Sequence, residues 1–286
     1  MNIKHSILTS LYLPLRVKNI VLKKFKRQYS PRLRVLLYHN IDLLNEAQFA
    51  AQIKWLKKTW KFIDLREFEA IINGHDNITE DSILLTFDDG FSSNRKIAEN
   101  ILNPLGIKAL FFIISDFADL GDKDDFRQFI SNGIFPLMAT ESIPHHWRNM
   151  NWGDLTYLLE SGHSLGAHTA THARLSDLST KELQKEIIDS ANKIETKLGI
   201  TIQHFAYTFG NLSSFSPEAL ELARKRFKYI HTGLRGDNAL ALSKWSIRRD
   251  AVTPKDPLFL VGSILEGGAD WPYEKDLLKY ESWGNG

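Results

Sequence analysis

The chain has 286 residues, which is enough for one large α/β domain or two small ones. Its composition, 43% hydrophobic and 24% charged residues, is that of an ordinary soluble globular protein. Because there is no cysteine, disulfides, thiolate metal ligands and a cysteine nucleophile are excluded, so any metal site must use His, Asp and Glu. The net charge of +2 indicates no particular partner.

The first 41 residues are strongly basic although the whole chain is nearly neutral. They hold no Asp or Glu and nine basic residues, namely Lys4, Arg16, Lys18, Lys23, Lys24, Lys26, Arg27, Arg32 and Arg34. Pro14 and Arg16 cut the apolar run short, so the pattern does not predict a secretory signal peptide. We expect residues 1–33 to form an N-terminal arm, either partly ordered without a partner or resting as a basic amphipathic segment on an anionic membrane surface.

From Arg34 almost to the C-terminus, short apolar runs alternate with helical patterns. Seven runs are expected to be strands, at residues 35–38, 83–87, 109–114, 163–167, 202–207, 228–232 and 245–248. Most are continuous apolar runs, as expected of parallel strands that are covered on both faces. The alternation predicts an α/β fold with a parallel sheet, open or closed into a barrel, and no linker or internal repeat divides it.

Local signals mark where some of the helices begin and end. Ser179 and Glu182 form a capping-box pattern, and Gly199 suits the position just after the end of the same helical pattern. Pro217 is placed to begin another helix, where its missing N–H does no harm. The polar segment 115–150 interrupts this rhythm, and it is interpreted either as an ordinary surface insertion or as a loop that shapes a substrate cleft.

Two adjacent carboxylates end the apolar run at residues 83–87. Asp88 and Asp89 are followed by Gly90, which lets the chain turn sharply away. Because side chains alternate in direction along a strand, the two acids should point differently, so one could bind a metal ion while the other takes a proton. Alone, this tripeptide is better explained as a turn than as a site.

A pair of histidines further along the chain makes a functional site more plausible than a simple turn. His168 and His172 lie four residues apart, a spacing that lets both imidazoles face one ion, and they follow another short strand-like run. Two imidazoles and one carboxylate form a common open metal site that leaves positions for water and substrate. Such pairs also occur by chance, so a purely structural role stays open.

Together these two stretches resemble a known family. Residues 86–90 (Thr-Phe-Asp-Asp-Gly) and 168–172 (His-Thr-Ala-Thr-His) are similar to the first two motifs of the polysaccharide deacetylases (NodB-homology, carbohydrate esterase family 4). The resemblance covers about residues 34–252. It implies an α/β fold, an irregular (β/α) barrel of the NodB-homology type in a single domain. We therefore expect a barrel over residues 34–265 with an insertion at 115–150, followed by a C-terminal tail at 266–286.

The resemblance also implies roles for individual residues. One divalent metal ion, zinc by expectation with cobalt or nickel as alternatives, would be held by Asp89, His168 and His172, and Asp88 would be the general base. The family's usual Leu-His motif near the C-terminus is absent. Residues 36–39 (Leu-Leu-Tyr-His) resemble instead the circularly permuted poly-N-acetylglucosamine deacetylase branch, which implies that His39 is the general acid. The alternative for His39 is a buried structural histidine.

A third motif resembles the family with two departures. Residues 205–210 (Phe-Ala-Tyr-Thr-Phe-Gly) match the Phe-Ala-Tyr-Pro-Phe-Gly seen in some relatives except at Thr208, and the match implies an oxyanion contact from Tyr207 and Phe209, through a backbone amide near Phe209. Ala206 stands where other members carry an arginine that orients the catalytic aspartate. Arg249, in preference to Arg248, is expected to replace it, the alternative being surface charge.

The candidate residues share one position relative to the expected strands. His39, Asp88, Asp89, His168, Phe209 and Arg249 all fall at or just beyond the C-terminal end of a run that is predicted to be a strand. Barrels assemble their active sites on that face, whereas chance placement would scatter some of these residues onto helices.

These observations lead us to expect a metal-dependent hydrolase that removes the N-acetyl group from an N-acetylated amino sugar. The substrate would be a polysaccharide or a lipid- or nucleotide-linked glycan precursor. Two alternatives are a deformylase or other N-deacylase of a lipid-linked amino sugar, and a degenerate family member that binds glycan without hydrolysing it. No nucleic-acid partner is expected, because the basic residues are confined to the N-terminal arm and no recognisable nucleic-acid-binding domain accompanies them. The basic N-terminal arm, which lacks a signal-peptide pattern, favours a cytoplasmic protein, and peripheral contact with the inner face of the membrane stays open as an alternative.

Overall fold

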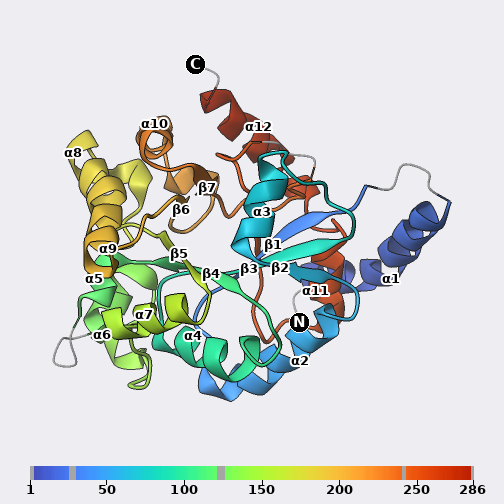
Figure 1. Cartoon of the computed structure of the whole chain (residues 1–286), viewed down its shortest axis with the longest axis horizontal. Coiled ribbons are helices and arrows are strands. Elements are labelled where there is room, and N and C mark those ends of the chain that lie inside the picture. The colour runs from blue at the N-terminus through green and yellow to red at the C-terminus, as the bar shows by residue number, and fades with distance from the viewer. Residues whose placement is uncertain (1–2, 26–29, 121–125, 240–242, 285–286) are drawn as a thin grey trace.

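The computed structural model describes residues 3–25, 30–120, 126–239 and 243–284. Its centre is one curled parallel sheet in the strand order β7-β6-β5-β4-β3-β1-β8, with the short strand β2 also paired to β3 (Figure 1). The strands are β1 Leu33–Tyr38, β2 Lys61–Ile63, β3 Ser82–Phe87, β4 Ala109–Ile113, β5 Ser164–Ala167, β6 His204–Ala206, β7 Tyr229–His231 and β8 Asp250–Ala251. The expected α/β fold with a parallel sheet is confirmed.

The two edges of the curled sheet are joined by one short segment. Ile247 forms a parallel bridge with His231 at the end of β7, and its carbonyl accepts a hydrogen bond from the Thr232 amide at 2.8 Å. A few residues further on, β8 pairs with β1 in parallel. Residues 247–251, the closing segment, therefore span the gap between β7 and β1, and this gives the sheet its irregular barrel shape.

The prediction of a strand at residues 245–248 is wrong. Residues 244–246 form a turn, only Ile247 bridges to a neighbouring strand, and the strand itself is Asp250–Ala251. Arg249 and Asp250 are fully buried, so this stretch carries charges where a core strand is expected to be apolar. The sequence pattern also missed β2, because three residues are too few to show a period.

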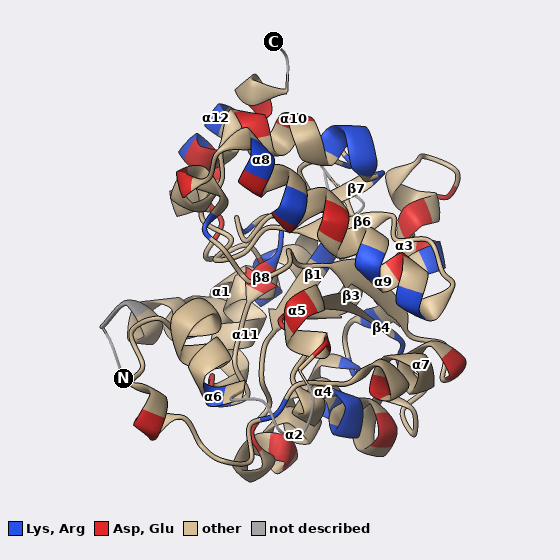
Figure 2. Ribbon diagram, turned by 90° about the vertical axis from the view of Figure 1, so that its left-hand side faces the viewer, with Lys and Arg blue, Asp and Glu red and all other residues tan. Residues whose placement is uncertain are grey.

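Helices cover the outer face of the curled sheet (Figure 1). Those of eight residues or more are α1 Ile3–Lys24, α2 Glu46–Leu56, α3 Leu65–Ile72, α7 Trp152–Glu160, α9 Ser190–Leu198, α10 Pro217–Arg226, α11 Leu258–Leu265 and α12 Glu274–Trp283. The shorter ones are α4 Ser92–Ile97, α5 Ser115–Ala118, α6 Phe126–Phe129 and α8 Thr180–Leu183. Acidic and basic residues are interspersed over the outer helices, as on an ordinary solvated surface (Figure 2).

The helix boundaries expected from local signals are present. The capping box of Ser179 and Glu182 begins α8, which continues through a π-helical turn, Gln184–Asp189, into α9. Gly199 ends α9 in the left-handed conformation at φ 66°, and Pro217 begins α10. The capping box and the left-handed glycine provide hydrogen-bond partners for backbone N–H and C=O groups that would otherwise be unpaired at the helix ends.

The two ends of the chain pack on the barrel. Within the expected arm at residues 1–33, α1 lies along α11 and buries Tyr12. Within the expected tail at 266–286, α12 buries Leu277 and Tyr280. No helix in the described ranges is both long and apolar enough to cross a membrane.

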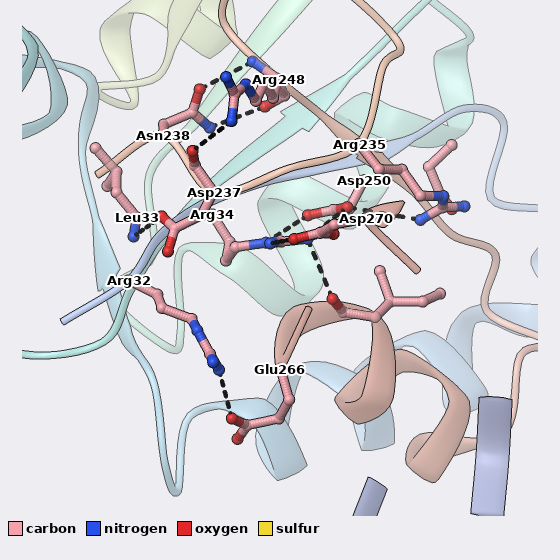
Figure 3. Close-up of polar contacts among 12 residues, drawn as sticks. Arg32, Leu33, Arg34, Arg235, Asp237, Asn238, Arg248, Asp250, Glu266 and Asp270 are labelled. Carbon is pink, nitrogen blue, oxygen red and sulfur yellow. Dashed lines mark hydrogen bonds and ion pairs between the residues drawn. The ribbon is translucent and has the colours of Figure 1, made fainter. Parts of the chain in front are cut away.

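A buried guanidinium ties the first strand to the closing segment (Figure 3). Arg34 on β1 is fully buried and donates to Asp250 on β8 from Nε at 2.8 Å and from Nη2 at 2.9 Å. It also donates to Asp270 at 2.7 and 2.9 Å and to the Ile264 carbonyl at 3.1 Å. Because a charge this deep is tolerated only with its partners in place, the network holds β8 against β1.

We predict that Arg34→Met destabilises the protein by about 3–5 kcal/mol in free energy of unfolding, because it leaves the buried Asp250 carboxylate without its main partner. Urea denaturation followed by circular dichroism measures this. Asp270→Asn is the matched control: Asp270 is 26% exposed and the Arg34–Asp250 pair survives, so a smaller loss of about 1–2 kcal/mol is expected. Equal losses in the two variants would contradict the special role of the Arg34–Asp250 pair.

Candidate active site

The candidate residues meet at one edge of the sheet because its strands are parallel. The register pairs Tyr38 with Phe87, so His39 and Asp88 follow side by side at the ends of β1 and β3. On β5, Ala167 pairs with Phe205, which brings the loop that begins at His168 beside the loop after β6. The carboxyl ends of the strands thus form one face, as expected of barrel active sites.

Asp89, His168 and His172 form a compact buried group. One ligand atom of each lies within 4.8 Å of the others, and both imidazole Nε2 atoms are 3.5 Å from Asp89 Oδ1. The Nδ1 atoms face backbone carbonyls, at 2.9 Å for His168 with Ala206 and at 3.0 Å for His172 with Gly133. Because a carbonyl only accepts, each Nδ1 carries the proton, which leaves Nε2 as a donor atom toward a cation.

The chemistry of this group fits a divalent metal ion. Both carboxylate oxygens of Asp89 are buried and have no hydrogen-bond partner within the described residues, which is costly for a charged group. Burial raises the pKa of Asp89, but interaction with His168 and the charges of His39 and His172 outweigh it and lower the pKa to about 2. Burial lowers the pKa of His172 to about 4, so it is neutral near pH 7. An ionised carboxylate with imidazole nitrogens is a typical donor set for zinc.

Backbone strain is concentrated at the same group. The described chain has four residues other than glycine with positive φ, and all lie here: Asp89 (76°), Thr169 (66°), His172 (64°) and Phe209 (58°). Each such conformation costs about 1–3 kcal/mol and persists only where its surroundings enforce it. Strain of this kind clusters at active sites and ligand clamps, so its location is evidence for a site that is independent of residue chemistry.

Asp88 and Asp89 both border His168 Nε2, at 3.7 and 3.5 Å, but their other partners differ. Arg249 holds Asp88 in a two-point contact, with Nη1 2.7 Å from Oδ1 and Nη2 3.0 Å from Oδ2. The guanidinium is fully buried, and its Nε donates to the Thr232 carbonyl at 2.9 Å. Arg248 instead lies 3.4 Å from Glu281. The arginine that orients the candidate base is thus Arg249, which reaches it from the closing segment.

His39 lies at the opening of the group. Its side chain is exposed, so it is not the buried structural histidine that was the alternative. Its charge acts on both Asp89 and His172, which places it close to the buried group. An exposed imidazole at the mouth of a site is accessible to a substrate.

The loop after β6 contributes Phe209, whereas the Tyr207 side chain turns away. The Phe209 ring lies 4.6 Å from the His172 ring. Tyr207 is buried and stacks on Phe215 at 4.0 Å, and its amide donates to the His231 carbonyl, so neither its side chain nor its N–H faces the site. The expected contact from this loop therefore rests on Phe209.

The threonine that replaces the family's proline anchors the same loop. Thr208 Oγ1 donates to the Ala173 carbonyl at 2.6 Å, and its own carbonyl accepts from Ser214 Oγ at 3.0 Å. The first bond ties the loop after β6 to the loop that carries the histidines, and the second lies within the loop after β6 itself. Hydrogen bonds thus restrain the loop at the position where relatives carry proline.

Sequence reasoning missed a residue that supports the histidine loop. Glu186 is buried, and its carboxylate accepts from the Ala170 and Thr171 amides and from Thr171 Oγ1, each at 2.9 Å. It holds the strained loop from the outside, whereas the candidate metal ligands are Asp89, His168 and His172. In a helical sequence pattern, an acidic residue is normally taken to face solvent. The only sequence clue to the buried role of Glu186 is its position directly beside the apolar stripe of the helix.

An apolar cavity of about 870 Å³ opens beside the site. It is lined by Phe209 and Arg174 and by residues 134–139 of the insertion. The insertion also reaches the group of Asp89, His168 and His172, through the Gly133 carbonyl that accepts from His172. This placement supports the interpretation of segment 115–150 as a loop that shapes a cleft.

Comparison with known proteins agrees with this fold and site. The family model described as polysaccharide deacetylase matches residues 75–226, more than half of the chain, and the chain belongs to this family. The protein YxkH of Bacillus subtilis (strain 168), which is named as a polysaccharide deacetylase, is 24% identical over 206 residues. That match covers 70% of this chain and 63% of YxkH, so the chain spans less than two thirds of this relative.

Solved structures share the fold at low sequence identity. The deacetylase PplD of Streptococcus pyogenes has a TM-score of 0.65 and 18% identity, covering 82% of this chain and 99% of that one. IcaB of Ammonifex degensii has a TM-score of 0.65 and 22% identity, covering 83% and 98%. The fold expected from the sequence motifs is therefore the one that these proteins adopt.

We predict that His168→Ala weakens metal binding. Removing a residue that only hydrogen-bonds to a metal ligand costs about 10–100-fold in affinity, and the loss of a ligand itself should cost more. Elemental analysis of protein dialysed against zinc measures this. Asp88→Asn is the matched control: Asp88 is buried at the same site but paired with Arg249, so metal content should stay near wild type. Unchanged metal in His168→Ala would remove His168 from the site.

Proposed function

We propose that this chain is a metal-dependent N-deacetylase that releases acetate from an N-acetylated amino sugar of a polysaccharide or of a lipid- or nucleotide-linked glycan precursor. One observation carries the proposal: two adjacent buried carboxylates have separate partners, Asp89 with two imidazoles and Asp88 with Arg249. Family membership supports the same class of reaction.

Asp89, His168 and His172 would hold the ion, which we expect to be zinc, with cobalt or nickel as alternatives. When bound, a divalent ion supplies polarisation of the amide carbonyl and lowers the pKa of a water molecule.

Asp88 is the group placed to take a proton from the attacking water. The two-point contact with Arg249 fixes the carboxylate plane, and the Nε bond to Thr232 fixes the guanidinium in turn. Asp88 Oδ2 lies 3.7 Å from His168 Nε2, so this carboxylate borders the metal group without belonging to it. A base held in this way transfers a proton with little reorganisation.

The second proton transfer falls to His39. Water adds to the acetamide carbon, the C–N bond then breaks, and the nitrogen must leave as an amine because an amide anion is a very poor leaving group. An imidazole can carry a proton near neutral pH and donate it to the leaving nitrogen. The backbone N–H near Phe209 would face the oxyanion that forms in between.

A second candidate substrate follows from the apolar cavity. The cavity beside Phe209 is lined mainly by apolar side chains, and Arg174 also lines it. It suits a substrate in which the amino sugar is attached through an anionic group to an apolar chain. Deacylation of a lipid-linked amino sugar, with acetyl or formyl as the acyl group, is the alternative that this observation favours.

We predict that Asp88→Asn lowers kcat by about 10²–10⁴-fold, because the amide cannot accept the proton of the attacking water. Acetate release from N-acetylglucosamine oligomers with added zinc or cobalt measures this. Metal content measured on the same sample separates loss of the base from loss of the ion. If wild type and Asp88→Asn behave alike on every acylated sugar, the catalytic interpretation fails, and a glycan-binding protein remains.

His39→Gln should discriminate between acid and base roles. We predict a kcat loss of about 10²–10⁴-fold on acetamido sugars but a much smaller loss on 4-nitrophenyl acetate, whose leaving group needs no proton. Asp88→Asn is the comparison, since loss of the base should slow hydrolysis of both substrates. Equal losses of His39→Gln on both substrates would remove the acid role.

A further inference from the structure

Helix α1 lies at the outer edge of the molecule, along α11 (Figure 1). Tyr12 is the centre of the contact, with its ring 5.0 Å from Phe259 and 5.6 Å from Trp55. A Cβ at Gly262 would come within 2.5 Å of the Tyr12 ring, so glycine permits this close approach. One face of α1 is therefore packed against α11, with Tyr12 and Asn19 buried in the contact.

A buried carboxylate fixes the orientation of α1. Glu266, at the end of α11, is only 3% exposed and accepts from Arg16 at 2.9 Å, from Asn19, and from Arg32 at 2.6 Å. Rotating the helix about its axis would take Arg16 and Asn19 away from this buried charge and leave it with Arg32 alone. The face that α1 presents outward is thus determined by the structure.

That outward face is apolar. Its large side chains are exposed by 46–58%, at Ile7, Leu13, Val17, Ile20 and Val21, with Leu11 at 38% and with Phe25 just past the helix end at 66%. Helices on the surface of a globular protein usually present polar residues opposite their packed stripe. Contiguous apolar patches of this kind mark sites of contact with a partner or a membrane.

The charges around this face indicate which kind of surface it would bind. Lys18 and Lys24 are exposed beside the apolar side chains, and the first 41 residues hold no acidic residue. The outer helices, by contrast, mix both signs (Figure 2). An apolar stripe with basic residues is complementary to an anionic lipid surface, where apolar side chains enter the acyl boundary and Lys meets the headgroups. Two copies joined through this face would bring like charges together.

We propose that the outward face of α1 docks on an anionic lipid bilayer and lies in its plane, because its inner face stays bound to α11 and Glu266. In a cell, the anionic cytoplasmic leaflet is a surface of this kind. The docking does not depend on the proposed deacetylation, because it uses no residue of the candidate active site.

The test is co-sedimentation of the full chain with vesicles that contain phosphatidylglycerol and with vesicles of phosphatidylcholine alone. Wild type should bind the anionic vesicles, and high salt should weaken the binding. The double variant Val17→Glu with Val21→Glu should bind at least about 10-fold more weakly, because it places two carboxylates on the docking face. Leu278→Glu on α12 is the matched control, since Leu278 is 69% exposed and should leave binding unchanged.

The substituted positions are exposed, so circular dichroism and gel filtration should show a folded double variant, and its acetate release from soluble oligomers should equal that of wild type. Failure of wild type to bind anionic vesicles would overturn the proposal, as would equal binding by the double variant. A wild-type dimer that the double variant abolishes would assign this face to a contact between copies instead. An inactive wild type that still binds vesicles would contradict only the proposed function.

Discussion

Two buried carboxylates that are adjacent in the chain impose the main constraint on this structure. Asp88 and Asp89 are at most 2% exposed, and neither charge can stay there without a cation. Because the chain turns between them, each needs its own partner. Arg249 neutralises Asp88, whereas Asp89 faces two imidazoles whose outer nitrogens are already committed to carbonyls. The end of β3 is thus stable only if the closing segment and the histidine loop both meet it.

The closing segment meets this constraint by alternating its side chains. Arg249 reaches Asp88 at the site, and the next residue, Asp250, reaches Arg34 in the structural network. Successive side chains of an extended segment point to opposite sides, so one short stretch carries two buried ion pairs. The contact that closes the barrel and the contact that orients the candidate base are therefore parts of the same backbone segment. A change that loosens β8 should disturb the geometry of Asp88 as well.

The strained loops need support from outside the site. Thr169 and His172 have positive φ, and the loop that carries them is held by Glu186 through two backbone amides and a hydroxyl. Thr208 ties the neighbouring loop to the same region. Such supports convert a costly backbone into a fixed arrangement of ligand atoms, which is what rapid proton transfer and tight metal binding both require.

The sequence by itself determined most of the sheet and the chemical identity of the site. Buried parallel strands are apolar throughout, so runs such as residues 83–87 and 109–114 are visible locally, and acids or histidines at their ends must meet at one edge. The partners of those residues were not visible in this way. Glu186, Gly133 and Arg34 act over long sequence separations, and a charged residue within an amphipathic pattern looks solvated until its partner is seen. Tertiary structure alone also decided the strand at Asp250–Ala251, whose buried charges hide it from an apolar pattern, and the outward face of α1, which depends on the docking of its other side.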